Sequence, residues 1–241
     1  MLNTYQLKEK SMEILSTLPN FCERDIYIGF GESWQDGIPF IETNGDSYIY
    51  LSYERGRCNE KRETRSLDEA LFGVIDGYIS SRSYDYERNN RIRYTDIRRL
   101  WFERQDMLFS LIGEPYYSMN RKRIDDILER YPYNDHNTRT LDLVKDFEKV
   151  AKVLKGSAIV DLKLSNDCRK NIDFFIQKPY RDQYKGIANF KEAFALMLSK
   201  YTLIIEEIRQ MDILIRALGI CDEIRKIDEQ IGKVDLDFII G

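Results

Sequence analysis

Apolar residues recur along the chain with two different periods, and these periods predict where helices and strands lie. Residues 4–18 place their apolar side chains three and four positions apart and stop before Pro19, which predicts an amphipathic helix. Two short stretches rich in β-formers follow, at residues 25–30 and 38–53. Because Asn44-Gly45 divides the second stretch and accepts positive φ angles, we expect a hairpin with a two-residue type I′ turn there.

A further strand and three helices complete the prediction for the first part of the chain. The segment from Lys61 to Arg65 alternates its charges, as a strand at an exposed sheet edge does. Ser66 with Glu69 three residues later is a helix-start signal, and helices are also expected at about 95–112 and 124–128. One face of the hairpin is expected to hold Ile41, Ile49, Leu51 and Tyr53. The predicted fold class is α+β, a small antiparallel sheet packed with helices.

The C-terminal part is predicted to be helical almost throughout. A four-three spacing of apolar residues continues over about 190–218, which indicates one long helix of a bundle or coiled coil. Residues 143–154 repeat this spacing, and 157–176 is expected to be helical although its first half also alternates like a strand. An intramolecular all-α bundle or hairpin is favoured over an intermolecular coiled coil, because three more leucines widen the apolar face: Leu196, Leu203 and Leu214.

Composition changes near residue 140. Residues 1–140 contain 16 Arg, 4 Lys and 13 Tyr, whereas residues 141–241 contain 5 Arg, 12 Lys and 3 Tyr. Turn-forming residues around Pro132 mark a junction at the same place. We therefore expect two domains, an α+β domain at 1–137 and a helical domain at 138–241.

Charge and residue usage argue against several classes of function. A formal net charge of -4 and a mean hydropathy of -0.50 give no strong attraction for nucleic acid or anionic membranes. Because the chain has no run of 18 apolar residues and no secretion signal, we expect a cytoplasmic protein that does not enter a membrane. The four cysteines form no CxxC motif and His136 is the single histidine, so we expect no metal, no cofactor and no catalytic centre.

Seven arginines lie between Arg82 and Arg104, with three tyrosines and a tryptophan among them. Such interleaving can bind nucleic acid through phosphates and bases. Four acidic residues in the same stretch reduce its net charge to +3, so internal salt bridges are the favoured interpretation. Arg98 and Arg99 are expected to be structural, with the guanidinium fork holding a loop carboxylate or carbonyl groups.

Four short motifs follow one another in a suggestive order. They are Tyr53-Glu54-Arg55-Gly56 at a hairpin, Arg98-Arg99 with Phe102 and Gln105 on a helix, Ile127-Leu128, and Tyr131-Pro132-Tyr133-Asn134-Asp135. Over about residues 24–135 this order resembles the immunity protein 63 family of bacterial polymorphic-toxin systems. The resemblance implies a cytoplasmic antidote that binds a cognate toxin domain and blocks it without an active site of its own. The motif residues expected to be structural are Arg55, Gly56, Arg98, Arg99, Phe102, Gln105, Pro132 and Asp135.

The first domain also has the composition of a protein-binding surface, because it is acidic and rich in tyrosine, which gives a large contact area at low entropic cost. A loop before the hairpin places Trp34 between Glu32 and Asp36, and this loop is the first candidate contact region. Tyr53 and Glu54 are further candidates, although core packing competes with partner contact for the tyrosines of the hairpin.

We therefore expect a non-enzymatic immunity protein whose partner is a toxin. Two alternatives from other classes stay open. One is a helical scaffold protein that forms a homodimer through residues 190–218, and the other is a nucleic-acid-associated protein that uses the region from Arg82 to Arg104.

Overall fold

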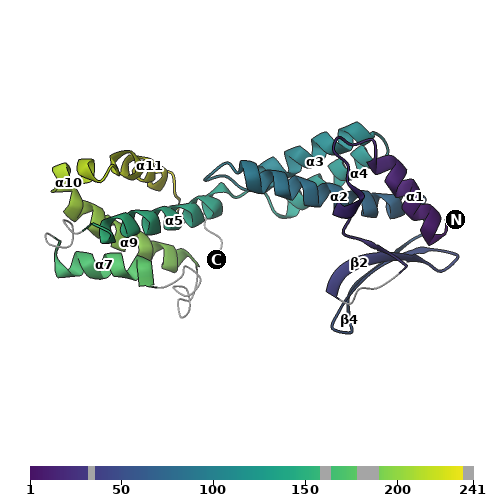
Figure 1. Cartoon of the computed structure of the whole chain (residues 1–241), viewed down its shortest axis with the longest axis horizontal. Coiled ribbons are helices and arrows are strands. Elements are labelled where there is room, and N and C mark those ends of the chain that lie inside the picture. The colour runs from purple at the N-terminus through teal and green to yellow at the C-terminus, as the bar shows by residue number, and fades with distance from the viewer. Residues whose placement is uncertain (32–35, 158–163, 178–189, 236–241) are drawn as a thin grey trace. The chain divides into compact units, whose positions relative to one another are not determined.

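A four-stranded sheet with helices forms the N-terminal part of the chain, and the described residues of the C-terminal part form helices, which confirms the predicted α+β fold class. The computed structural model describes residues 1–31, 36–157, 164–177 and 190–235. The chain divides into unit 1 and unit 2 (Figure 1). Unit 1 is Met1–Arg91 with Ile97–Tyr133, and unit 2 is Ile92–Asp96 with Asn134–Gly241. The sequence predicted a boundary at 137/138 and gave no sign of the segment Ile92–Asp96.

Unit 1 is an α+β layer structure. Its elements are α1 (Thr4–Leu15), a 3-10 turn (Glu23–Asp25), β1 (Gly29–Phe30), β2 (Asp36–Thr43), β3 (Tyr48–Glu54), β4 (Arg57–Thr64), α2 (Leu67–Asn90), α3 (Arg98–Ile112) and α4 (Tyr116–Arg130). The strand order is β1-β2-β3-β4, with β1 parallel to β2 and the other pairs antiparallel. The edge strand expected at 61–65 is therefore confirmed and begins earlier, and Ser66 caps α2 by accepting from the Glu69 N–H.

The turn chemistry of the two hairpins differs from the expectation. Thr43 pairs with Tyr48, so the β2–β3 loop has four residues, and the predicted two-residue turn at Asn44-Gly45 is wrong. The Asn44 side chain accepts hydrogen bonds from the backbone N–H groups of the third and fourth loop residues, at 3.1 and 2.9 Å, and so closes a wider loop. The two-residue turn lies between β3 and β4 instead, where Arg55 and Gly56 have φ angles of 51° and 76°.

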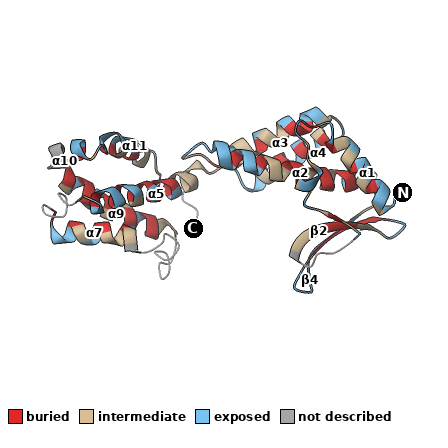
Figure 2. Cartoon of the chain, in the orientation of Figure 1, coloured by how far each residue is buried: buried red, intermediate tan, exposed pale blue. Residues whose placement is uncertain are grey.

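The two faces of the sheet carry separate apolar clusters. The face toward the helices contributes Ile41, Tyr48 and Tyr50 to the main core of unit 1. The other face holds Phe40, Ile49 and Leu51, with Tyr53 packed against them. Figure 2 shows buried residues on both the strands and the helix faces. The expectation that Ile41 would share a face with Ile49 is wrong, because Ile41 pairs directly with Tyr50 and directly opposed residues point to the same side.

Helix α2 approaches the sheet very closely at Gly73. A Cβ atom at this position would lie 2.7 Å from the Cζ and hydroxyl oxygen of Tyr50, so the helix backbone rests on the tyrosine ring where any side chain would clash. Tyr50 is only 8% exposed as a result. This contact sets the height of the helical layer above β3 and β4.

Unit 2 is helical in its described part. Its helices are α5 (Asp135–Lys155), α7 (Asn166–Gln177), α9 (Phe190–Arg209), α10 (Asp212–Ala217) and α11 (Cys221–Ile231). Helix α7 covers the later half of the helix expected at 157–176, whereas residues 158–163 lie outside the described residues.

The apolar spacing over about 190–218 belongs to two helices and not to one. The N–H groups of Gln210 and Met211 bond to carbonyls three residues earlier, which ends α9 in a tighter turn before α10 begins. Ile208 and Ile215 are both buried in the same core, so the spacing continues across the break. Periodicity reports which side of the chain is buried and does not report whether the helix is continuous.

The seam of α9 faces the interior of unit 2. Five of its residues are at most 1% exposed: Phe194, Met197, Tyr201, Ile204 and Ile208. The ring of Phe147 on α5 stacks on that of Tyr201, with centroids 4.2 Å apart. The apolar residues that suggested a dimer interface therefore pack against other helices of unit 2.

Two buried carboxylates of α5 hold the segment Ile92–Asp96. The backbone N–H of Tyr94 donates to Asp142 at 2.9 Å, and the Tyr94 hydroxyl donates to Asp146 at 2.6 Å. Arg93 also pairs with Asp146, at 2.6 Å. Burial and the bond to Asp146 raise the pKa of the Tyr94 phenol, so the phenol stays a hydrogen-bond donor. These bonds hold Tyr94 at a φ of 65°, which a residue with a side chain rarely adopts.

Tyr94→Phe tests this attachment. The change removes one hydrogen bond to a buried carboxylate, so the free energy of unfolding should fall by about 1–2 kcal/mol. Chemical denaturation of the full chain measures it, and Tyr131→Phe, at a residue 68% exposed, serves as the control with no expected change. Equal stability of Tyr94→Phe and the unaltered chain would show that the segment is not held by this bond.

Candidate partner-binding surface

One end of the sheet gathers three of the candidate contact residues. Asp36 and Glu54 are directly opposed in the β2–β3 register, and Glu54 is also opposed to Arg57 on β4. The Tyr53 ring stacks on Phe40 with centroids 6.0 Å apart, while Glu54 is exposed. Glu32 and Trp34 lie outside the described residues. The register therefore places Asp36, Tyr53 and Glu54 together.

Two motif arginines contact the chain after α4. Arg98 donates to the carbonyl oxygens of Tyr131 and Pro132, at 2.7 and 2.9 Å. The Arg99 guanidinium lies over the Tyr133 ring, 4.4 Å from its centroid. Phe102 on α3 lies within ring-contact distance of Tyr133 as well. In these contacts both arginines hold the loop after α4.

Asp135, another residue of the family motifs, also holds a neighbouring segment of the chain, in unit 2. Its carboxylate accepts from the Asp96 N–H at 2.7 Å, and the Asp96 carboxylate accepts from the Asn134 N–H at 2.9 Å. These bonds attach the segment Ile92–Asp96 to the start of α5.

Arg123 on α4 stands at the centre of a polar network that joins α2, α3 and α4. It donates to Asp76 on α2, to Gln105 on α3 and to Asn120 on its own helix, each at 2.9 Å. Gln105 in turn donates to the Ser80 hydroxyl at 2.9 Å, and that hydroxyl donates to Asp76 at 3.0 Å. Gln105 and Asn120 are fully buried, so the network supplies the hydrogen bonds that burial takes from water.

The network also has an electrostatic balance. Burial raises the pKa of the Asp76 carboxyl above its ordinary value, and Arg123 and the Ser80 hydroxyl act against that rise. The Nε of Arg123 is buried without a hydrogen-bond partner among the residues that the structure describes. The ion pair of Arg123 with Asp76 therefore helps to hold the three helices together, and loss of either residue would leave the other without its opposite charge.

A groove lies between β4, α2 and α4. Its first part has a volume of about 460 Å³, and its lining includes Arg62 and Thr64 of β4, Phe72 and Asp76 of α2, and Met119 and Arg123 of α4. A second part of about 480 Å³ continues along α4 past Lys122, Asp126 and Ile127. Both parts share Glu69, Phe72, Met119 and Arg123, so they form one continuous depression. Phe72 and Met119 are half-buried in its floor.

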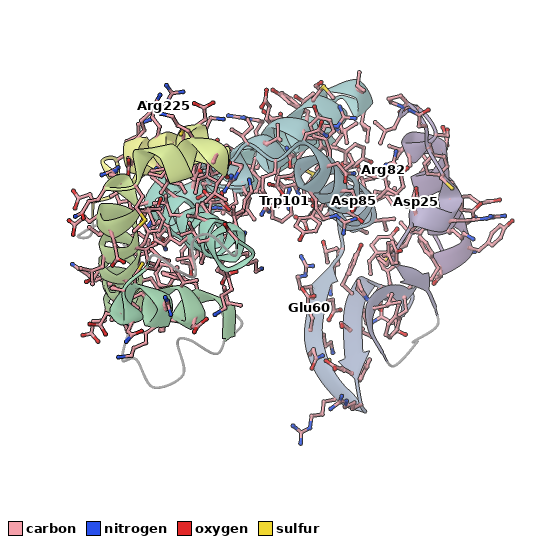
Figure 3. All side chains as sticks on the ribbon, turned by 60° about the vertical axis from the view of Figure 1, so that its left-hand side comes forward. Asp25, Glu60, Arg82, Asp85, Trp101 and Arg225 are labelled. Carbon is pink, nitrogen blue, oxygen red and sulfur yellow. The ribbon has the colours of Figure 1, made fainter. Side chains whose placement is uncertain are left out.

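The arginines between Arg82 and Arg104 contact other residues of the chain. Arg82 pairs with Asp25 at 3.2 Å, and Figure 3 labels both side chains. Arg91 pairs with the buried Glu87 at 2.8 Å, and Arg104 lies over the Tyr86 ring at 4.8 Å. These contacts reduce the charge that this stretch can offer to nucleic acid.

The described part of the chain holds no candidate metal centre. Within residues 1–31, 36–157, 164–177 and 190–235, no three His, Cys, Asp or Glu residues form a group able to hold a metal ion. His136 accepts a hydrogen bond at Nδ1 from the Asp235 N–H, at 3.3 Å. None of the helices in those ranges has the length and apolar character needed to cross a bilayer.

One of the comparisons with known proteins gives a match. Residues 44–126 match the family model of immunity protein 63, from the β2–β3 loop into α4. The match confirms the family resemblance over about a third of the chain and includes Arg55, Gln105 and Arg123, whereas Pro132 and Asp135 lie beyond it. No curated protein and no solved structure matched the chain.

The groove was not expected from the sequence. The sequence predicted only a short helix that holds Ile124, Ile127 and Leu128 and stops before Pro132, so Met119 and Arg123 were not assigned to it. Phe72, next to the buried Leu71, was the available signal, because an apolar residue beside the buried stripe widens the apolar face of α2.

Arg123→Met tests the network. The change leaves Asp76, Gln105 and Asn120 short of a donor, so the free energy of unfolding should fall by about 3 kcal/mol. Because an unpaired Asp76 is ionised more easily in the unfolded chain, the loss should be larger at pH 8 than at pH 5. Arg130→Met, at an exposed position of the same helix, is the control. A loss independent of pH would contradict the pairing with Asp76.

Proposed function

We propose that this protein is an immunity protein that binds a cognate bacterial toxin domain and neutralises it. The observation that carries the proposal is the family match at residues 44–126, which coincides with β3, β4, α2, α3 and most of α4. The match covers several consecutive strands and helices of unit 1 and is not confined to one short motif. It therefore favours a mode of action shared with the family. The protein would act in the cytoplasm of the producing cell.

We infer that the protein works by covering its partner and not by catalysis. Support comes from the polar residues of unit 1, since Asp76, Gln105 and Asn120 each accept a hydrogen bond from Arg123, and these bonds hold helices together. A tyrosine-rich, acidic surface suits protein recognition, because aromatic residues give contact area and acidic residues select a basic partner.

The sheet end with Tyr53 and Glu54 is our proposed contact region, together with the preceding segment that holds Glu32, Trp34 and Asp36. The exposed carboxylate of Glu54 and the partly buried ring of Tyr53 combine a charge with an apolar anchor. A basic groove on the toxin would complement this end of the sheet.

No specific observation favours either alternative function. The α9 residues that would form a dimer seam are buried in unit 2, and several arginines between Arg82 and Arg104 have partners in the chain.

Co-expression tests the proposed function directly. Cells that produce the toxin domain encoded by the neighbouring gene should stop growing, and this chain should restore growth when produced with it. The two proteins should also purify together as a complex that weakens with added salt. Growth arrest despite full production of the soluble chain would contradict the proposal.

A matched pair of variants locates the contact. Glu54→Lys should weaken toxin binding by about ten-fold, because it reverses a charge in the proposed contact region. Glu129→Lys makes the same change at an exposed position of α4 and should bind as the unaltered chain does. Equal affinities of the two variants would place the contact elsewhere.

A further inference from the structure

The outer edge of β4 has no strand beside it in the described part of the chain. β4 is the last strand in the sheet order, and its residues are exposed from Arg57 to Glu63. An edge strand leaves alternate backbone N–H and C=O groups without a strand partner. An extended peptide can use these groups by adding a strand to the sheet.

The groove lies between this edge of the sheet and the helical layer. Helix α4 packs on α2 and α3, and the groove separates it from β4. Phe72 and Met119, which would be covered if another strand lay beneath α4, are half-buried in the floor of the groove. The Tyr50 hydroxyl, in the same lining, is buried without a hydrogen-bond partner among the described residues. A partly apolar surface of α2 and α4 is therefore left open beside β4.

We propose that an extended segment of the toxin adds to β4 as a fifth strand and points alternate apolar side chains into the groove. This inference rests on the proposed function, since the partner is the toxin. Backbone hydrogen bonds to β4 would supply much of the affinity, and the groove would select the side chains. The part of the groove beside β4, with a volume of about 460 Å³, lies within the size range of roughly 300–1,000 Å³ typical of binding pockets.

The charges on β4 indicate what the added strand carries. Glu60 and Arg62 form an ion pair at 2.7 Å on the exposed strand, and Figure 3 labels Glu60 there. Arg62 is opposed to Tyr50 and therefore points to the helix side of the sheet, whereas Lys61 is opposed to Leu51 and points to the other side. A strand with a basic residue opposite Glu60 and an acidic residue opposite Lys61 complements this pattern.

The strand addition continues from the proposed contact region without a gap. β4 begins at Arg57, which is opposed to Glu54, and it ends at Thr64 beside the groove. One toxin segment that follows β4 would pass from the sheet end with Tyr53 and Glu54 to the apolar floor. A second copy of this chain could also pair at the same edge, and the experiment separates the two occupants.

Hydrogen exchange of the full chain, alone and with the purified toxin domain, tests the proposal. Peptides that cover Arg57–Thr64 should exchange at least about ten-fold more slowly in the complex, because edge amides gain partners. Peptides from α1 should be unchanged. A complex with no added protection on β4 would overturn the strand addition and leave the proposed function standing, whereas no complex at all would overturn both. Protection of β4 in the free chain, with the mass of a dimer, would identify a second copy as the occupant and also overturn it.

Two methionine variants test the groove independently of the backbone. Met119→Glu places a charge in the apolar floor and should weaken toxin binding by about ten-fold or more. Met107→Glu makes the same change on α3 at a residue 45% exposed and outside the groove, and its affinity should stay within about two-fold. Thermal unfolding confirms that both variants are folded. Equal affinities of two folded variants would show that the toxin does not enter the groove.

Discussion

The hydrogen bonds of Arg123 are the interaction on which the architecture of unit 1 depends. One guanidinium connects α4 to Asp76 on α2 and to Gln105 on α3. The contact of Gly73 with Tyr50 fixes α2 on the sheet, and Arg123 then fixes α4 relative to α2. Because β4 and α4 form opposite walls of the groove, its shape follows from these two contacts.

This arrangement explains how a chain with a single histidine could recognise a partner protein specifically without catalytic chemistry. Its buried polar groups hold helices in place, and its surface offers a strand edge, an apolar groove floor and a sheet end with Tyr53 and Glu54. Such features recognise the backbone, side chains and charge of another protein. Unit 2 buries the seam that could have served assembly, and the carboxylates of α5 hold the segment that carries Tyr94.

Local signals in the sequence identified individual elements well and their connections less well. The cap at Ser66, the edge strand and the apolar face of α5 depend on neighbouring residues and were confirmed. The four-residue loop at Asn44 depends on side-chain bonds that the Asn-Gly pair does not reveal, and the break after Arg209 is hidden because α9 and α10 share one core. Likewise, Tyr94 meets Asp142 and Asp146 about fifty positions away, and Arg123 meets Asp76 across 47 positions. Patterns of period and composition do not contain such long-range pairs.

The central claim is that the chain neutralises a toxin by occupying it. Titration of a fixed amount of the active toxin domain with this chain, with toxin activity as the readout, tests that claim most directly. Occupation predicts that activity falls in proportion to added chain and disappears at a fixed stoichiometric ratio, independently of incubation time. If a small fraction of that amount removed all activity over time, the chain would be modifying the toxin catalytically and the account would be contradicted.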